Sequence, residues 1–215
     1  MLEKAVESLK TGIHVDRHTI YIYKTFKGRF REEQDFEIHV RNNGAETHLL
    51  YAKVFHGRPP EYSPWVELYE INERIRLGGR TTSYFDSPFE ESILKLFADS
   101  LAAGAKMFVE YYNDGETKAQ LETGMPVVIS RLGHKMFKLG FTWFKDWYYP
   151  EGYMEGNQKL QGEKPLNSNV RKRHALSISK ELASFSQILA RVDTTRIHLK
   201  RATARMREIS KLLQC

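Results

Sequence analysis

A glycine-rich segment, Gly78-Gly79-Arg80-Thr81-Thr82, carries the residue types best suited to binding a phosphate group. Arg74 and Arg76 precede it, and a helix is expected to follow. Backbone N–H groups of such a turn, together with the positive end of a helix dipole, can hold a phosphate. The glycine spacing matches neither the dinucleotide-binding fingerprint nor the phosphate-binding loop of nucleoside triphosphatases. The segment is therefore a candidate phosphate site without a diagnostic motif.

Three acidic residues favour a different interpretation of this segment. Asp86, Glu90 and Glu91 cluster where the helix is expected to begin, so they already complement the positive end of its dipole. They would also repel an incoming pyrophosphate. An ordinary loop is the favoured interpretation, and phosphate binding is the alternative.

A second group of reactive side chains lies in the aromatic run from residue 144 to residue 156. Glu151 and Glu155, with Asp146 nearby, suit an acid–base pair or a metal site. The favoured interpretation is structural, with a strand end and a loop packing their aromatic side chains on the core.

Histidines give no diagnostic pattern. His14 and His18 are four residues apart, but the residues that follow them are typical of a strand, so the two would not share a helical face. No metal site is predicted. Since no Gly-x-Ser-x-Gly nucleophile elbow occurs either, the catalytic residues stay unassigned.

The elements expected to position these residues begin with antiparallel strands over residues 13 to 71. Apolar and polar residues alternate there, and Asn42-Asn43-Gly44 is typical of a hairpin turn. A loop containing two adjacent prolines leads to a fourth strand, 65–71. The first part of the chain is therefore predicted to be a meander.

From residue 87 the apolar period becomes helical. Ser87-Pro88-Phe89-Glu90 is a capping box that predicts a helix over 88–103. A short apolar strand is predicted at 106–112 in the centre of the sheet, then a helix at 126–139 and an aromatic strand at 141–149. The fold class is α+β (mixed α/β), an antiparallel meander followed by helix, strand, helix and strand.

Glycine and proline mark a boundary near residue 165. All 14 Gly and 7 Pro lie at or before Pro165, which indicates long helix beyond it. From residue 167 onward eleven Lys and Arg stand against three acids, a net +8. Because the whole chain carries +6, the remaining 166 residues carry −2. We expect a domain over 1–165 and a basic helical C-terminal extension over 166–215.

Apolar residues of the extension recur at helical spacing and form one stripe. Asp193-Thr194-Thr195 offers capping side chains, so one long helix and two helices are both open. The stripe must be buried against the body, its own second half or another chain, and we expect it to contribute to a homodimer. The basic surface also suits nucleic acid, although a solvated face is the favoured interpretation. The stripe consists of Ile178, Leu182, Phe185, Leu189 and Val192, continued by Leu199, Met206 and Leu213.

The order of these elements resembles the acyl-CoA N-acyltransferase (GNAT) fold over roughly residues 12 to 160. Local matches are Asn113 after the central strand and Lys138-Leu139-Gly140-Phe141 after the next helix. The stretch from Phe108 to Pro165 is also similar to an uncharacterised prokaryotic protein family of unknown function, which is associated with the GNAT-like group.

The resemblance implies a divergent acyl-CoA-dependent N-acyltransferase with a degenerate CoA site and acetyl-CoA or another acyl-CoA as cofactor. Arg76-Leu-Gly-Gly-Arg80 only partly matches the family's pyrophosphate turn, and Met136 stands where a tyrosine often serves as general acid. The implied cofactor-binding residues are Arg76, Gly78, Gly79, Arg80, Thr81 and Asn113.

Two alternatives remain. The second half of the chain also resembles the last strands of an S-adenosylmethionine-dependent methyltransferase, but that fold needs an early parallel strand and a glycine-rich turn. The other alternative is a non-catalytic interaction protein that binds nucleic acid or a partner through its basic C-terminal helix.

The composition predicts a cytoplasmic protein without a membrane span. The only cysteine is Cys215, so no disulfide can form within one chain. Residues 1 to 10 alternate charged and apolar side chains and lack the apolar segment of a signal peptide. The longest apolar run, Met125 to Ile129, is far shorter than the ~20 residues that a membrane-spanning helix needs.

Overall fold

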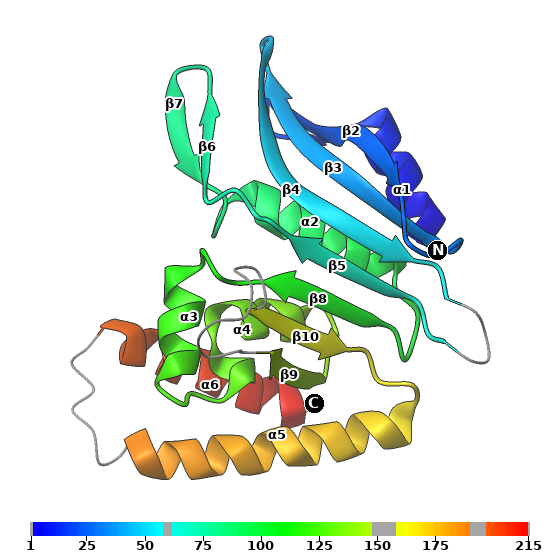
Figure 1. Cartoon of the computed structure of the whole chain (residues 1–215). Helices are drawn as coiled ribbons and strands as arrows, with labels where there is room; N and C mark the ends of the chain where they lie inside the picture. The colour runs from blue at the N-terminus through cyan, green and yellow to red at the C-terminus, as the bar shows by residue number, and fades with distance from the viewer. Residues whose placement is uncertain (1, 58–61, 148–157, 190–196, 215) are drawn as a thin grey trace.

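The computed structural model describes residues 2–57, 62–147, 158–189 and 197–214. Its centre is an eight-stranded sheet with the order β1-β2-β3-β4-β5-β8-β10-β9 (Figure 1). The strands of this sheet are β1 (Ile13–Val15), β2 (His18–Lys27), β3 (Glu33–Asn42), β4 (Ala45–Phe55), β5 (Trp65–Tyr69), β8 (Lys106–Glu110), β9 (Trp143–Trp147) and β10 (Lys159–Glu163).

Strands β5 and β8 are the one parallel pair of this sheet within the described residues. Trp65 is aligned with Lys106 and Leu68 with Val109, and all the other described pairs are antiparallel. β8 lies between β5 and β10, so the prediction of a central strand starting at residue 106 is confirmed. The antiparallel meander predicted for residues 13 to 71 is confirmed as well, with Asn43 and Gly44 at positive φ in its β3–β4 turn.

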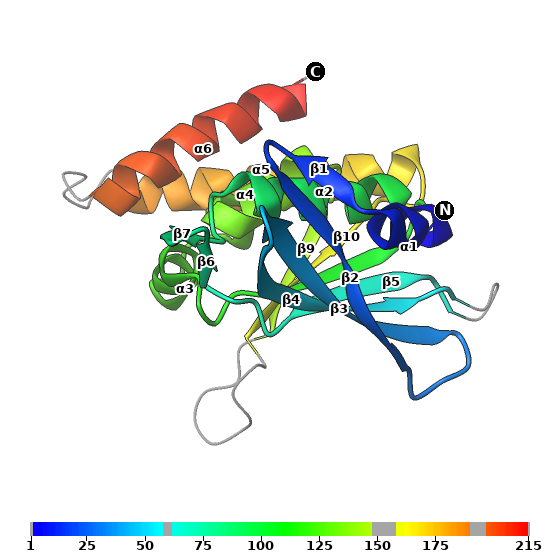
Figure 2. The same ribbon diagram turned by 90° about the horizontal axis from the view of Figure 1, so that it is seen from above.

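Six α-helices occur in the described residues. Figure 2 shows helices on one face of the sheet, and within the described residues no helix covers the opposite face, which we call the open side. Apolar side chains such as Val66, Leu68 and Met107 point to the helical side and are fully buried. The period of two along a strand then places the alternate residues on the open side. The helices are α1 (Leu2–Thr11), α2 (Pro88–Ser100), α3 (Gly115–Glu122), α4 (Arg131–Lys138), α5 (Ser168–Leu189) and α6 (Ile197–Gln214).

The predicted capping box at the start of α2 is confirmed. The Ser87 hydroxyl accepts a hydrogen bond from the Glu90 N–H at 3.3 Å, and the Glu90 carboxylate accepts one from the Asp86 N–H at 2.9 Å. The helix ends at Ser100, three residues earlier than predicted. The Ser87 side chain thus satisfies one of the first-turn N–H groups of α2, that of Glu90.

The glycine-rich segment differs from the expected loop that leads into a helix. It is a hairpin of β6 (Arg74–Leu77) and β7 (Arg80–Ser83), and Gly78 and Gly79 form its two-residue turn at φ +55° and +80°. Both turn positions require a positive φ, which glycine adopts without strain. The glycines thus stand at the tip of a hairpin that projects beyond the sheet (Figure 1).

The helix predicted for 126–139 is wrong in its first part. Residues Val127–Ile129 form a single 3-10 turn, and α4 begins only at Arg131. Ser130 has an extended backbone, and its hydroxyl accepts a hydrogen bond from the Gly133 N–H at 3.1 Å, so it caps the shorter helix. Helices α1 and α3 were not predicted at all.

The C-terminal extension forms α5 and α6, which pack on one another and on the body. Ile178, Leu182 and Phe185 of the predicted stripe are buried in one cluster with Val128 and Ile129. The body and the second half of the extension thus cover the stripe. Asp193-Thr194-Thr195, the predicted break, lies outside the described residues. Among the helices of the described ranges, none is long and apolar enough to cross a membrane.

Candidate functional site

The carboxyl ends of the parallel strands β5 and β8 bring two carboxylates together. Glu70 follows β5 in a left-handed conformation (φ +46°), which non-glycine residues rarely adopt, and its N–H donates to the Glu110 carboxylate at 2.6 Å. The Asn113 amide donates to the Ile71 carbonyl at 3.3 Å. The side chains of Glu110, at the end of β8, and of Asn113, just after it, therefore bridge the strand ends. Strain of this kind is concentrated at functional sites.

Aromatic side chains continue from these carboxylates across the open side of the sheet. Tyr51 of β4 stacks on Tyr69 of β5 with ring centroids 5.7 Å apart, and His48 lies 4.8 Å from Tyr51. The pairing of β4 with β5 explains the contact, because Tyr51 and Tyr69 face each other directly. We call His48, Tyr51, Tyr69, Glu70 and Glu110 the strand-end site.

Burial changes the acid–base properties of Glu110. Glu110 is only 5% exposed. Desolvation raises the pKa of the carboxyl group, although the hydrogen bond from Glu70 and the charge of Lys159 oppose that shift. A carboxyl group with a raised pKa can accept or give a proton nearer to neutral pH than an exposed one.

The two tyrosines and the histidine of the strand-end site are held in their neutral forms by shifts in their pKa values. Desolvation raises the pKa of Tyr69, with nearby acids including Glu70 adding to the effect, and it raises the pKa of Tyr51 in the same way. Desolvation and the charge of His39 lower the pKa of His48. The His48 Nε2 is buried and has no hydrogen-bond partner within the described residues. An unpartnered buried imidazole nitrogen is a place where a ligand group can bind.

The surroundings of the site are mainly acidic. Glu67, one pleat before Tyr69, forms an ion pair with Lys159, and Glu37 contacts the His39 ring at 2.7 Å. Glu67, Glu70 and Glu110 are the three carboxyl groups close to Lys159, and the Lys53 ammonium group lies 5.8 Å from the centroid of the Tyr69 ring. The arrangement is suited to holding a cation against aromatic rings and to moving a proton.

A buried ion cluster closes the first turn of α2, where the sequence suggested a phosphate. Arg131 is 2% exposed and donates to Glu90 at 2.7 Å, and it also donates to Asp114 and Asp86. Lys135 donates to both Asp86 and Glu90. Burial alone would raise the pKa of Glu90, but the hydrogen bonds and charges of Arg131 and Lys135 outweigh it and lower that pKa.

The six predicted cofactor-binding residues fall in two places. Asn113 lies at the strand ends, beside the strand-end site and near the base of the β6–β7 hairpin. The other five lie in the hairpin itself, with Arg76 opposite Thr81 and with Gly78 and Gly79 at the tip next to Arg80. All five residues are exposed. Their role in binding a cofactor stays a prediction.

The predicted carboxylate pair is described only in part. Asp146 accepts a hydrogen bond from the Tyr111 hydroxyl at 2.6 Å, and burial raises its pKa. Glu151 and Glu155 lie outside the described residues. His14 and His18 lie on adjacent antiparallel strands, as their sequence context predicted. In the described ranges no three His, Cys, Asp or Glu side chains come together as a metal site.

Sequence analysis missed the strand-end site. Its residues come from three strands, and no spacing along the chain links them. One signal was present, since Glu110 ends the apolar strand Lys106–Glu110 and so places a charge at the end of a central strand. The left-handed Glu70 has no sequence signature.

Comparison with known proteins gives a family without a function. Residues 16–191 match the family model described as "Protein of unknown function (DUF1122)". The chain is also similar to a crystal structure of a protein of unknown function from Aquifex aeolicus VF5, at 30% sequence identity and a TM-score of 0.81. That similarity covers 100% of this chain and 98% of the other. No curated protein sequence matches the chain.

Proposed function

Because the chain belongs to the DUF1122 family of proteins of unknown function, which brings no activity with it, we propose a function from the strand-end site alone. The protein is an enzyme, divergent from the N-acyltransferases, that binds a primary amine as its ammonium ion and removes a proton from it. The observation that carries this proposal is the buried Glu110 carboxyl group, with its raised pKa, at the end of the parallel strand pair.

Recognition of an ammonium group follows from charge and aromatic character. Three carboxyl groups against two lysines near the rings leave a negative excess that attracts a cation and disfavours an anion. The Tyr51 ring adds cation–π attraction for an ammonium group or its neighbouring carbons, whereas Lys53 already lies 5.8 Å from the centroid of the Tyr69 ring. The unpartnered His48 Nε2 offers a further hydrogen-bond acceptor while the imidazole is neutral.

Proton removal is the chemical step that the site can assist. An amine is nucleophilic only when its nitrogen lone pair is free, so an ammonium substrate must lose one proton before it reacts. In this step the proton moves from the ammonium nitrogen to the Glu110 carboxylate, and the N–H bond electrons become the lone pair. A base with a raised pKa performs this step more readily than an ordinary carboxylate.

The fold supports an acyltransferase-like scaffold for this chemistry. β8 lies inside the sheet and pairs in parallel with β5, to which α2 connects it, and this pairing supports the resemblance to N-acyltransferases. In an open sheet, ligands bind outside the carboxyl ends of parallel strands, which is where Glu70 and Glu110 lie. A methyltransferase fold would need an early parallel strand, whereas β1 to β5 pair only antiparallel with one another, so the fold gives the methyltransferase alternative no such support.

An acyl-CoA does not fit in the position that N-acyltransferases use. Their pyrophosphate turn leads straight into a helix, whereas here the β6–β7 hairpin intervenes. The first turn of α2 is also closed, because the Ser87 hydroxyl accepts from the Glu90 N–H and Arg131 fills the acidic cluster beside it. We therefore derive no step through CoA at α2.

The second candidate function is acyl-CoA binding with the phosphates on the hairpin instead. Arg76 and Arg80 support it, because within the described residues neither side chain forms an ion pair. The predicted set of Arg76, Gly78, Gly79, Arg80 and Thr81 would then contact the phosphates, with Asn113 at the slot between the strands. Acetyl-CoA at about 100 times its Kd should stabilise the chain by about 2.7 kcal/mol. An Arg76→Glu/Arg80→Glu variant should lose that gain, and an unchanged gain would place the cofactor elsewhere.

Amine binding is tested by calorimetric titration of the full chain at pH 7. The probes are 2-phenylethylamine, the neutral 2-phenylethanol and the anionic 3-phenylpropanoate. We expect the amine alone to bind, and Glu70→Gln and Glu110→Gln each to weaken it by about tenfold through the loss of a charged partner. Glu163→Gln is the matched control, since Glu163 lies at the other end of β10. Equal binding of the alcohol, or unchanged affinity in both variants, would refute the proposal.

Partner and location proposals are separate from the chemistry. The buried stripe leaves exposed apolar residues on the helical extension, and we propose that Leu176, Ile188 and Leu212 contribute to a homodimer. Sedimentation of the full chain decides this, because a monomer at high concentration would contradict it. Nucleic acid remains the alternative partner for the basic surface, and a cytoplasmic location is proposed from the cysteine content.

A further inference from the structure

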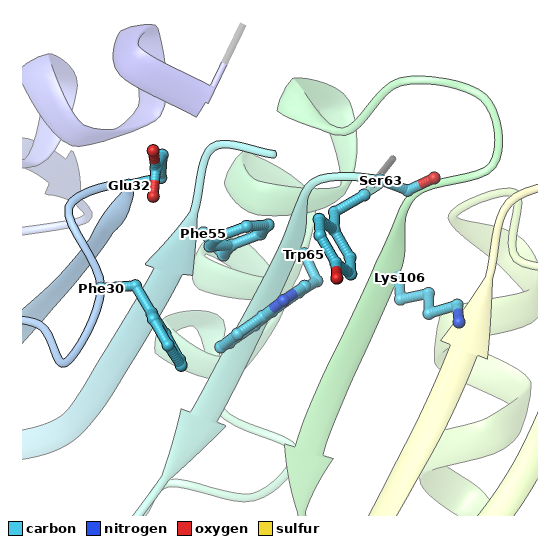
Figure 3. A pocket seen from close by; sticks show the side chains of 7 residues that line it. Phe30, Glu32, Phe55, Ser63, Trp65 and Lys106 are labelled. Carbon is cyan, nitrogen blue, oxygen red and sulfur yellow. The ribbon is translucent and has the colours of Figure 1, made fainter. Parts of the chain in front are cut away.

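A hollow lies at the end of these strands opposite the strand-end site, on the open side of the sheet. Trp65 begins β5 and Lys106 begins β8, and the pocket around them has a volume of about 580 Å³. Trp65 and Tyr69 are four residues apart on one strand, so about 13 Å separates this pocket from the strand-end site. The residues that line it are Phe30, Glu32, Phe55, Tyr62, Ser63, Trp65 and Lys106 (Figure 3).

Four aromatic rings gather around this hollow, and two of them remain exposed. Phe30 is 54% exposed and Tyr62 is 59% exposed, while Phe55 is buried and stacks on Trp65 with centroids 5.6 Å apart. Rings gathered around a hollow suit a flat apolar ligand, which would cover Phe30 and Tyr62 and stack on the indole of Trp65. The shape and surface of the pocket therefore favour a planar ring.

A lysine of the pocket determines which ligand charge the pocket favours. Lys106 is the lysine of the pocket, and within the described part of the chain its side chain has no ion pair and no hydrogen bond. Figure 3 shows Lys106 and Glu32 on opposite sides of the aromatic rings. An anionic group on the ligand is attracted toward Lys106, so the ligand binds with that group at the Lys106 end of the pocket.

We propose that this pocket binds a planar aromatic carboxylate, with the ring between Phe30, Tyr62 and Trp65 and the carboxylate on Lys106. The preference is opposite in sign to that of the strand-end site, which takes a cation. The two sites are therefore distinguishable by ligand charge, and neither proposal depends on the other.

Fluorine NMR of the full chain labelled with 5-fluorotryptophan tests the proposal. The chain has three tryptophans, and Trp65→Phe assigns the Trp65 signal. Naphthalene-2-carboxylate should shift that signal saturably, whereas the neutral naphthalene-2-methanol should bind about tenfold more weakly. Lys106→Met should remove the difference between the two probes. Lys24→Met, which removes an exposed lysine of β2, should leave both affinities unchanged.

The aromatic contribution is tested with Tyr62→Ala, because a ring that is 59% exposed contributes little to the folded core. This variant should weaken both probes and keep the preference for the carboxylate. Far-ultraviolet circular dichroism confirms folding of each variant, and Tyr62→Ala carries the test if Lys106→Met does not fold. Equal affinity for the carboxylate and the alcohol in the wild-type chain overturns the proposal, as does an unshifted Trp65 signal.

Discussion

Replacing Arg131 with methionine tests whether the ion cluster closes the first turn of α2. The change would leave the Glu90 and Asp114 carboxylates without their main partner, although both side chains are only 3% exposed. Removing one member of a buried ion pair costs about 3 to 5 kcal/mol, because the remaining charge stays buried. We expect the free energy of unfolding, measured by urea denaturation at pH 7, to fall by about that amount.

A matched control separates the buried charge from charge in general. Lys135→Met removes a second cation from the same carboxylates, but its side chain is 28% exposed and solvent screens it. It should cost about 1 kcal/mol or less. Adding Glu90→Gln to Arg131→Met should restore part of the lost stability, since it removes one unpaired charge. A loss below about 1 kcal/mol for Arg131→Met would refute the reasoning and reopen the first turn of α2 to a phosphate.

Three further changes test other parts of the structure. Burial raises the pKa of Glu110, so its protonated form stabilises the fold fully below the unfolded pKa of 4.5, and this stabilisation is lost as the pH rises through the folded pKa. Glu110→Gln should therefore gain free energy of unfolding relative to the wild type between pH 4.5 and pH 7, as measured by urea denaturation. Free energies of unfolding that change with pH in the same way for both proteins would contradict this. A Cβ atom on Gly133 would lie 1.9 Å from the Val127 carbonyl oxygen. Gly133→Ala should therefore lower the free energy of unfolding by about 2 kcal/mol or more, although alanine favours a helix more than glycine does. A variant more stable than the wild type would show that this close contact does not exist. Glu116→Ala breaks the ion pairs with two arginines of α6 and should speed amide hydrogen exchange in α6 while exchange in α2 stays constant, whereas unchanged α6 exchange would contradict a tethering role.

Much of the fold could be predicted because local patterns determine it. Strand alternation over residues 13 to 71 and the Ser87 capping box each act within a few residues, and both are confirmed. The hairpin at Gly78 was mistaken for a loop because its strands have only four residues each, and β7 is polar throughout. The helix after Pro126 was placed too early because the Ser130 cap carried less weight than the apolar run before it.

The strand-end site could not be predicted for a different reason. Glu110 acquires its raised pKa only when β8 is central and its carboxylate meets the Glu70 N–H. Tyr51 and Tyr69 meet only through the register of β4 with β5. Both conditions depend on tertiary pairing, which no spacing along the chain encodes. Asn113, in contrast, was identified from its place after the central strand, and its amide does bridge the strand ends.

The central claim is that the strand-end site holds an ammonium group beside Glu110. Its most direct test is a carbon NMR titration of the side-chain carboxyl group in protein labelled with ¹³C-glutamate, with Glu110→Gln assigning the signal. The account predicts that Glu110 titrates above 4.5 in the free protein and that saturating 2-phenylethylamine lowers that pKa, because a neighbouring cation favours the carboxylate. A Glu110 that titrates at or below 4.5, or whose titration the amine leaves unchanged, would contradict the account.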